Sequence, residues 1–276
     1  MKQRVLFWIL AALITILTAY YQRVTGPTYP VSGKVSLNGQ TISYTLDRSH
    51  PGPANAPVKI KTDDASIHGE VSWKRYRSDD EWTRVPMKYE DGFLVAELPH
   101  QPPAGKLIYK LELRQGDQRV SVPGSDPIVI RFRGDVPVAS FILHLAAMFA
   151  AMLLSTRTGL EHFSKEPKFK KLTFWTLGSL FVGGFIFGPA MQYYAFDTWW
   201  TGWPVGTDLT DNKTAVAFIV WIIAAFALYK AKNPRRWVLG AAIVLIVVYL
   251  IPHSVLGSEL DYKELDKQGA TTGRTQ

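Results

Sequence analysis

The chain of 276 residues contains no cysteine, and this absence removes several classes of protein at once. Disulfide scaffolds, thiolate zinc sites, cysteine nucleophiles and covalently attached c-type haem all need that residue. The sequence also lacks a Walker loop, a dinucleotide-binding glycine fingerprint, and the HExxH, GxSxG and kinase signatures. The lack of these motifs does not exclude an enzyme, but no motif in the sequence indicates one.

Five long stretches lack charged residues altogether. They are residues 5–21, 138–155, 172–190, 214–229 and 237–251. A helix needs roughly 17–25 residues of this kind to cross a bilayer. The sequence therefore predicts a membrane bundle of five transmembrane helices, with the first retained as an uncleaved anchor.

Lysine and arginine gather beside alternate apolar stretches. Residues 2–4, 157–171 and 230–236 carry net charges of +2, +3 and +4. Basic residues in short loops stay on the cytoplasmic side of a membrane. We therefore expect a multi-pass protein with a cytoplasmic N-terminus, with residues 25–137 and the C-terminus outside. The formal charge of +8 is then a topology signal, and we expect no nucleic-acid partner.

Residues 25–137 show the alternation typical of β-strands. Asn38-Gly39 is a strong hairpin signal, and Gly116-Asp117 marks a second turn. Apolar side chains alternate with polar ones in the stretch KLIYKLELR: Leu107, Tyr109, Leu111 and Leu113. About seven short strands predict an all-β sandwich of immunoglobulin or fibronectin type. The expected domains are 1–24 (anchor), 25–137 (β-sandwich), 138–253 (four membrane helices) and 254–276 (polar tail).

The stretch YYAFDTWWTGWPVGTDLTDNK, residues 193–213, is expected to be an outward-facing loop. Tryptophans are typical of the membrane interface, and acidic residues suit a helix N-terminus, where we expect Thr210 or Asp211 to be the cap. We predict that residues 199–213 fold back over the outer end of the bundle and take part in partner binding or domain coupling. The candidate residues are Trp199, Trp200, Trp203, Asp208 and Asp211. The expected partners of Asp208 are Lys213, the outer end of another helix, Arg131 and Arg133.

A second candidate site lies inside the second apolar stretch. His144, Met148 and Met152 are spaced four apart, which places them on one helical stripe. A histidine with thioethers suits Cu(I), and His144 with His253 would suit a b-type haem. Ordinary packing by methionine and a structural histidine are the competing interpretation.

Two further features concern packing and charge. Gly184 and Gly188 have GxxxG spacing, which we interpret as close packing within the bundle rather than dimerisation. Glu161 and His162 lie among charged residues, and we expect them on the solvated face of an interfacial cytoplasmic helix.

About two thirds of the chain, from Val71 to His253, resembles an uncharacterised family of bacterial multi-pass membrane proteins. The resemblance rests on VPM (85–87), LPHQPPAGKLIYKLEL (98–113), VIRFRGDVP (129–137), LLSTRTGLE (153–161) and FWTLGSLFVGGFIFGPAMQYYAFDTWWTGWPVGTDLTDNKT (174–214). It implies a bacterial membrane protein with an extracytoplasmic β domain, which we expect in the cytoplasmic (inner) membrane, and it supplies no activity that can be carried over.

The expected function is therefore a non-enzymatic envelope protein, whose β domain binds or docks a membrane or periplasmic protein. The alternative is a haem- or copper-binding membrane protein linked to respiration or metal handling. Under either hypothesis, we expect the lipid bilayer to be a partner of the protein.

Overall fold

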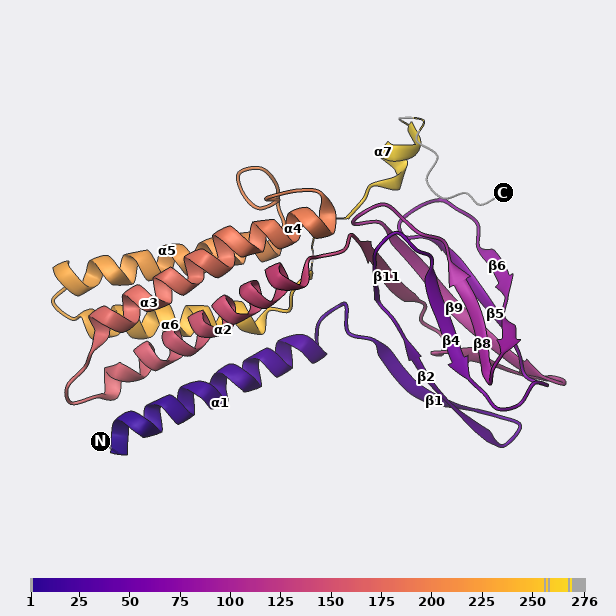
Figure 1. Cartoon of the computed structure of the whole chain (residues 1–276), viewed down its shortest axis with the longest axis horizontal. Helices are drawn as coiled ribbons and strands as arrows, with labels where there is room; N and C mark the ends of the chain where they lie inside the picture. The colour runs from indigo at the N-terminus through magenta and orange to yellow at the C-terminus, as the bar shows by residue number, and fades with distance from the viewer. Residues whose placement is uncertain (1, 256, 258, 268, 270–276) are drawn as a thin grey trace. The chain divides into compact units, whose positions relative to one another are not determined.

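The structure is a computed structural model that describes residues 2–255, 257, 259–267 and 269. The chain divides into two compact units. One, the membrane unit, contains residues 2–27 and 136–257, and the other, the β unit, contains residues 28–135 and 259–267. Figure 1 labels the elements of both units.

The membrane unit is helical, as the apolar stretches predict. Helices α2, α3, α5 and α6 pack side by side, and α1 lies against α2 and α6 (Figure 1). The elements are α1 (Lys2–Val24), α2 (Val138–Leu160), the 3-10 turn η1 (Glu161–Phe163), α3 (Phe169–Phe181), the π-helical turn η2 (Val182–Phe187), α4 (Gly188–Phe196), α5 (Leu209–Lys230) and α6 (Pro234–Leu250).

Four helical stretches are long and apolar enough to cross a membrane: Lys2–Val24, Val138–Phe163, Phe169–Phe196 and Leu209–Lys230. The fifth predicted span forms a helix, α6, but it has only 17 residues. At 1.5 Å per residue such a helix is about 26 Å long, against a hydrocarbon core of roughly 30 Å. Helices long and apolar enough to span a membrane are thus present at four of the five predicted places, and α6 is a shorter helix at the fifth.

Two glycines of η2 bring neighbouring helices close together. A Cβ atom on Gly184 would lie 2.6 Å from Cγ2 of Thr214 in α5, and one on Gly183 would lie 2.7 Å from Sδ of Met148 in α2. Any larger residue would force these helices apart, because both separations are shorter than a normal contact. The glycines therefore serve packing within the unit, as predicted, although the pair in contact is Gly183 and Gly184 rather than Gly184 and Gly188.

The β unit contains strands in three sheets. Their orders are β1-β2, β3-β11-β9-β5-β6 with β10 also on β9, and β4-β8-β7. The strands are β1 (Val31–Leu37), β2 (Gln40–Leu46), β3 (Ser49–Pro51), β4 (Ala56–Lys61), β5 (His68–Arg75), β6 (Thr83–Pro86), β7 (Lys88–Glu90), β8 (Phe93–Leu98), β9 (Lys106–Gln115), β10 (Gln118–Val122) and β11 (Ile128–Arg133). All pairs are antiparallel except β3 with β11.

Both predicted turns are present. Asn38 and Gly39 have φ angles of 48° and 81° and join β1 to β2, the left-handed pair that a type I′ hairpin requires. Gly116, at φ 58°, turns β9 into β10. The strand count exceeds the predicted seven because short edge strands such as β3 and β7 carry too few residues for an alternating pattern.

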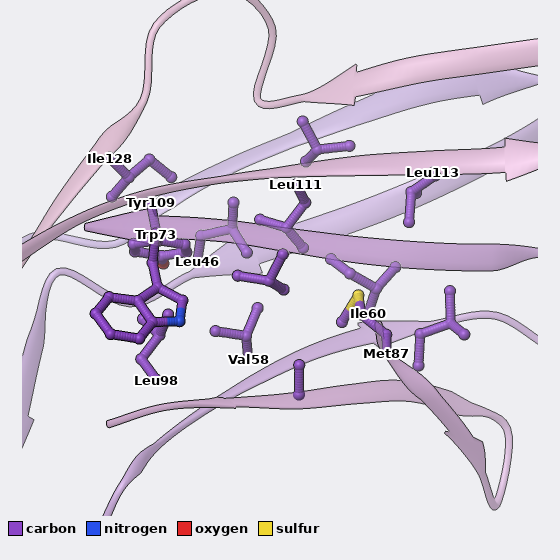
Figure 2. Packing of buried hydrophobic residues seen from close by; sticks show 14 of the residues in the cluster. Leu46, Val58, Ile60, Trp73, Met87, Leu98, Tyr109, Leu111, Leu113 and Ile128 are labelled. Atoms are coloured by element: carbon purple, nitrogen blue, oxygen red, sulfur yellow. The ribbon is translucent and has the colours of Figure 1, made fainter. Parts of the chain in front are cut away.

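Strand β9 supplies the centre of the β core. Its alternate residues Leu107, Tyr109, Leu111 and Leu113 are all buried, as the alternation predicts. Figure 2 shows side chains from β9 and those of β4 and β8, including Val58 and Leu98, filling the space between the ribbons. Tyr109 brings a hydroxyl into this core, and that hydroxyl donates to the carbonyl of Asp47 at 2.9 Å.

The C-terminal segment joins the β unit. Residues 259–267, which include helix α7 (Tyr262–Lys267), pack on it through hydrogen bonds and ion pairs. The predicted polar tail 254–276 is therefore partly a structural element of the β unit. Residues 256, 258, 268 and 270–276 of that tail lie outside the described residues.

We expect Leu113→Ala to destabilise the β unit by about 2–5 kcal/mol, because a fully buried leucine leaves a cavity. Arg114→Ala, one position along the same strand on the exposed face, should change stability by no more than about 0.5 kcal/mol. Thermal unfolding of the detergent-solubilised protein, followed by β-sheet circular dichroism, compares the two. Equal melting of both variants would contradict this account of the core.

Candidate functional site

The loop between α4 and α5 is built around one carboxylate. Asp211, in the first turn of α5, is only 9% exposed. Its Oδ2 accepts hydrogen bonds from the backbone N–H of Thr201 at 2.7 Å and of Gly202 at 3.1 Å, and it lies 3.2 Å from the Thr201 hydroxyl. Hydrogen bonds to a charged oxygen are among the strong ones, so this cluster fixes the loop to the helix.

Neighbouring polar groups hold the rest of the loop. Asn212 Oδ1 accepts from the N–H of Trp203 at 2.7 Å. Asp208 caps α5, since its Oδ1 accepts from the N–H of Thr210 at 2.7 Å. The stretch is therefore a defined structure, as predicted. The cap is Asp208, however, and not Thr210 or Asp211, because Asp211 turns toward the loop.

Asp208 interacts with groups of its own helix, α5. Its side chain serves its own helix, and its charge acts on Lys213 at the start of the same helix. Pairing with Arg131 or Arg133, which belong to the β unit, stays a prediction.

The tryptophans do not pack as expected. Trp200 stacks on Phe185, with ring centroids 5.8 Å apart, and Trp199 stacks on Tyr193 at 4.5 Å. Yet Trp199 is 59% exposed and Trp203 is 78% exposed. The expectation that residues 199–213 fold back over the bundle therefore does not extend to the side chain of Trp203. Large exposed indoles beside membrane helices suit the interfacial anchoring that the sequence also indicated.

The predicted metal stripe faces the turn η2. The carbonyl of Gly183 lies 2.9 Å from Nδ1 of His144, so Nδ1 carries the proton and Nε2 is left as the acceptor. Met148 contacts the same glycine, whereas Met152 is fully buried among the packed helices. His253 follows the end of α6 and is exposed.

Within the described ranges, no three His, Cys, Asp or Glu side chains gather as metal ligands. The copper and haem b hypotheses therefore stay predictions. A free Nε2 on His144 fits either one, and the buried Met152 equally fits ordinary packing.

The C-terminal end of α6 is fixed by two side chains from other helices. Lys213 is 6% exposed, and its ammonium donates to the carbonyl of Ile251 at 2.5 Å. Gln22 of α1 donates to the carbonyl of Tyr249 at 2.7 Å. The last carbonyls of a helix have no partners within it, so these donors satisfy them and join α1, α5 and α6 at one end.

At the other end of α2 lies a charged pair that the sequence reasoning missed. Arg157 and Glu161 form an ion pair of 2.6 Å, with side chains only 4% and 2% exposed. The guanidinium also lies 5.4 Å from the ring centroids of both Phe7 and Trp8 in α1. The prediction that Glu161 lies on a solvated face is therefore wrong, because α1 and the residues after η1 cover it.

The same carboxylate orders the connection to α3. Glu161 Oε2 accepts from the backbone N–H of Lys168 at 2.7 Å. Nearby, Arg235 at the start of α6 donates to the carbonyl of Ser164 at 3.3 Å. The predicted interfacial helix is replaced by η1 and this hydrogen-bonded turn. The i,i+4 spacing of Arg157 and Glu161 was the signal that could have revealed the pair.

Several buried polar atoms in the membrane unit have no hydrogen-bond partner among the described residues. They include Ser155 Oγ, Thr156 Oγ1, Thr173 Oγ1, Trp221 Nε1 and Nε of Arg157. An unpaired buried polar group costs free energy, so such groups in the membrane unit usually mark waters or a functional path. The hydroxyls of Ser155, Thr156 and Thr173, together with Arg157 and Glu161, make this end of the bundle polar inside.

The chain matches no family model, no curated protein and no solved structure in the comparisons made. The resemblance drawn from the sequence therefore stays a prediction, and the site is argued from its geometry alone.

We expect Asp211→Ala to lower the stability of the membrane unit by at least ~2 kcal/mol, because three donors lose a charged acceptor. Trp203→Ala is the matched control, and its 78% exposure predicts a change within about 0.5 kcal/mol. Both variants are compared by thermal unfolding and by the rate of chymotryptic cleavage in the loop. Greater sensitivity of the Trp203 variant would reverse this order.

Breaking the buried ion pair should cost more than removing it whole. Glu161→Ala leaves Arg157 charged and unpaired, at an expected cost of about 3–5 kcal/mol. The double variant Arg157→Met with Glu161→Leu should recover most of that loss, because apolar pairs of similar volume often replace buried ion pairs without penalty. Melting temperatures in detergent test the difference, and additive losses in the double variant would contradict it.

Proposed function

We propose that this is a non-enzymatic bacterial envelope protein, in which an extracytoplasmic β unit binds or docks a partner protein while the helices anchor it in the cytoplasmic membrane. We further propose that the β unit is an immunoglobulin- or fibronectin-like sandwich. The observation that carries the proposal is a folded β unit tied to membrane helices at both ends. Only residues 25–30 separate α1 from β1, and residues 134–137 separate β11 from α2.

The docked C-terminal segment supports the five-span topology. Residues 259–267 pack on the β unit, so the segment after α6 and the domain before α2 must lie on one side of the membrane. Returning to the same side takes an even number of crossings. Three crossings, by α2, by α3 with α4, and by α5, would leave the segment on the wrong side. Helix α6 therefore has to supply the fourth, with modest thinning of the bilayer to match its length.

The distribution of charge supports the orientation. The loops after α2 and α5 carry the basic residues, and their net charges of +3 and +4 favour the cytoplasm. The β unit and the C-terminal segment then face the outside. A binding surface there is held a few residues from the bilayer, which suits a partner that is itself a membrane or periplasmic protein.

The orientation can be measured with single cysteines, because the natural chain has none. An impermeant thiol reagent should label Ala65→Cys and Lys267→Cys in intact cells. Lys165→Cys and Asn233→Cys should react only after the membrane is opened. All four positions are exposed in the structure, so a silent site reflects the membrane and not burial. External labelling at position 165 would overturn the topology.

The binding role is tested with a photo-crosslinking amino acid in living cells. Exposed positions on the β unit, such as Lys59 and Arg114, should give the same crosslinked protein reproducibly. The matched control is Lys232, between α5 and α6, where that product should be absent. A β unit that yields no specific product from any exposed position would count against the proposal.

A further inference from the structure

The β unit holds its own C-terminal segment by a set of polar contacts spaced along one short peptide. Glu259 pairs with Lys106 at 2.7 Å and with Arg77, and Asp266 pairs with Arg75 at 2.7 Å. Between them Tyr262 is 3% exposed. Three anchors at positions i, i+3 and i+7 of one segment thus meet cations and polar backbone of the β unit.

The hydroxyl of Tyr262 takes the place of a backbone hydrogen-bond partner at the end of the sheet. Strand β5 ends at Arg75 while β9 begins at Lys106, and the last backbone bond between them runs from the N–H of Tyr76 to the Lys106 carbonyl at 3.0 Å. The next donor, the N–H of Lys106, finds the hydroxyl of Tyr262 at 2.9 Å. That hydroxyl is also 3.0 Å from Gln101 Oε1, so a phenol completes the end of the ladder.

The receiving site is held in shape by the β unit itself. Arg75, with a side chain 5% exposed, is oriented by two hydrogen bonds to Asp80, at 2.6 and 2.8 Å. Gln101 is 1% exposed, and its amide donates to the carbonyl of its neighbour His100 at 2.8 Å. These bonds lie outside the C-terminal segment, so they can persist when the segment leaves.

A glycine keeps the centre of the site open. A Cβ atom on Gly105 would lie 2.9 Å from the hydroxyl of Tyr262 and 2.8 Å from Cβ of Gln101. Any side chain at this position would therefore collide with the phenol. Backbone also contributes, since the carbonyl of Ala104 accepts from the N–H of Leu260 at 3.2 Å.

We propose that this surface of the β unit is a peptide-binding site for an acidic, tyrosine-centred segment of a partner protein, which residues 259–267 occupy in cis. The inference rests on the proposed function and names its site. Recognition needs a carboxylate three residues before the tyrosine and another four residues after it, matching Glu259, Tyr262 and Asp266. A covalently linked segment competes at an effective concentration on the order of millimolar, so it keeps the site closed to weak ligands.

Acidity should release the segment. Partial burial opposes ionisation of Glu259, but the hydrogen bond and charge of Lys106 and the charge of Arg77 outweigh it and lower the pKa of this carboxyl below 4.5. A lowered pKa stabilises the docked state above pH 4.5 and withdraws that contribution as the pH falls through the lowered value. Protease sensitivity of residues 259–267 should therefore rise at acid pH before the β unit itself unfolds.

The test uses the full-length protein in detergent and a fluorescent peptide with the sequence of residues 257–269. The variant Tyr262→Ala with Asp266→Ala empties the site, so it should bind the peptide at least tenfold more tightly than the natural chain does. A second variant, Asp266→Asn alone, keeps the phenol and should show the same direction with a smaller change. Fluorescence anisotropy measures both affinities.

The matched control is Glu264→Ala with Lys267→Ala, which removes a local exposed pair on the outer side of α7 and should bind like the natural chain. A peptide lacking the tyrosine and the last anchoring aspartate should not bind any variant. If the emptied variants melt normally and still fail to bind the peptide, the site is wrong even where crosslinking finds a partner. Peptide binding without any crosslinked partner in cells would instead refute the proposed function alone.

Discussion

A segment near the C-terminus that packs on a domain inserted after the first helix constrains every helix between them. In the proposed topology, Tyr262 and Asp266 reach the β unit only if the chain returns to the side of the membrane that it left at α2. On that proposal, α6 is a full crossing in spite of its length, because unpaired backbone groups are costly in lipid. The proposal also explains why donors from α1 and α5 gather at its last carbonyls, where a short helix would otherwise expose them.

Each end of the membrane unit contains buried charged side chains, and the two ends stabilise them in different ways. At the end that carries the long loop, Asp211 satisfies backbone donors of Thr201 and Gly202, so the charge is used locally. At the other end, Arg157 and Glu161 neutralise one another while aromatic rings of α1 cover the guanidinium. A buried ion pair adds little net stability, since desolvation offsets most of its attraction. The pair and the neighbouring hydroxyls of Ser155 and Thr156 make the interior of the bundle polar at this end.

Much of the fold was predictable because its signals are local. Alternation in β9, the left-handed turn at Asn38-Gly39 and the uncharged stretches each depend on a few neighbouring residues. The candidate site was predictable only in part. Asp211 was named correctly, but its partners are backbone groups, which no side-chain pattern reveals. Glu161 was assigned to the solvent because charge in a sequence looks solvated until a distant element, here α1, is known to cover it. The docking of residues 259–267 depends on contacts across more than 150 positions, and these have no sequence period.

The contacts of residues 259–267 with the β unit are largely polar, and polar contacts allow one segment to be exchanged for another. An apolar tail would bury itself permanently, because leaving the surface would expose hydrophobic area to water. Two of the three anchors of this segment are instead carboxylates, which water solvates well, and the third is a tyrosine whose hydroxyl can bond to water although its ring is apolar. Arg75 keeps Asp80 as a partner in either state, so departure of the segment does not strand a buried charge. Exchange of one acidic segment for another therefore leaves the hydrogen-bond count of the site unchanged. The segment of the same chain competes better than a partner peptide because it is covalently attached and therefore always near the site, whereas the partner binds from solution.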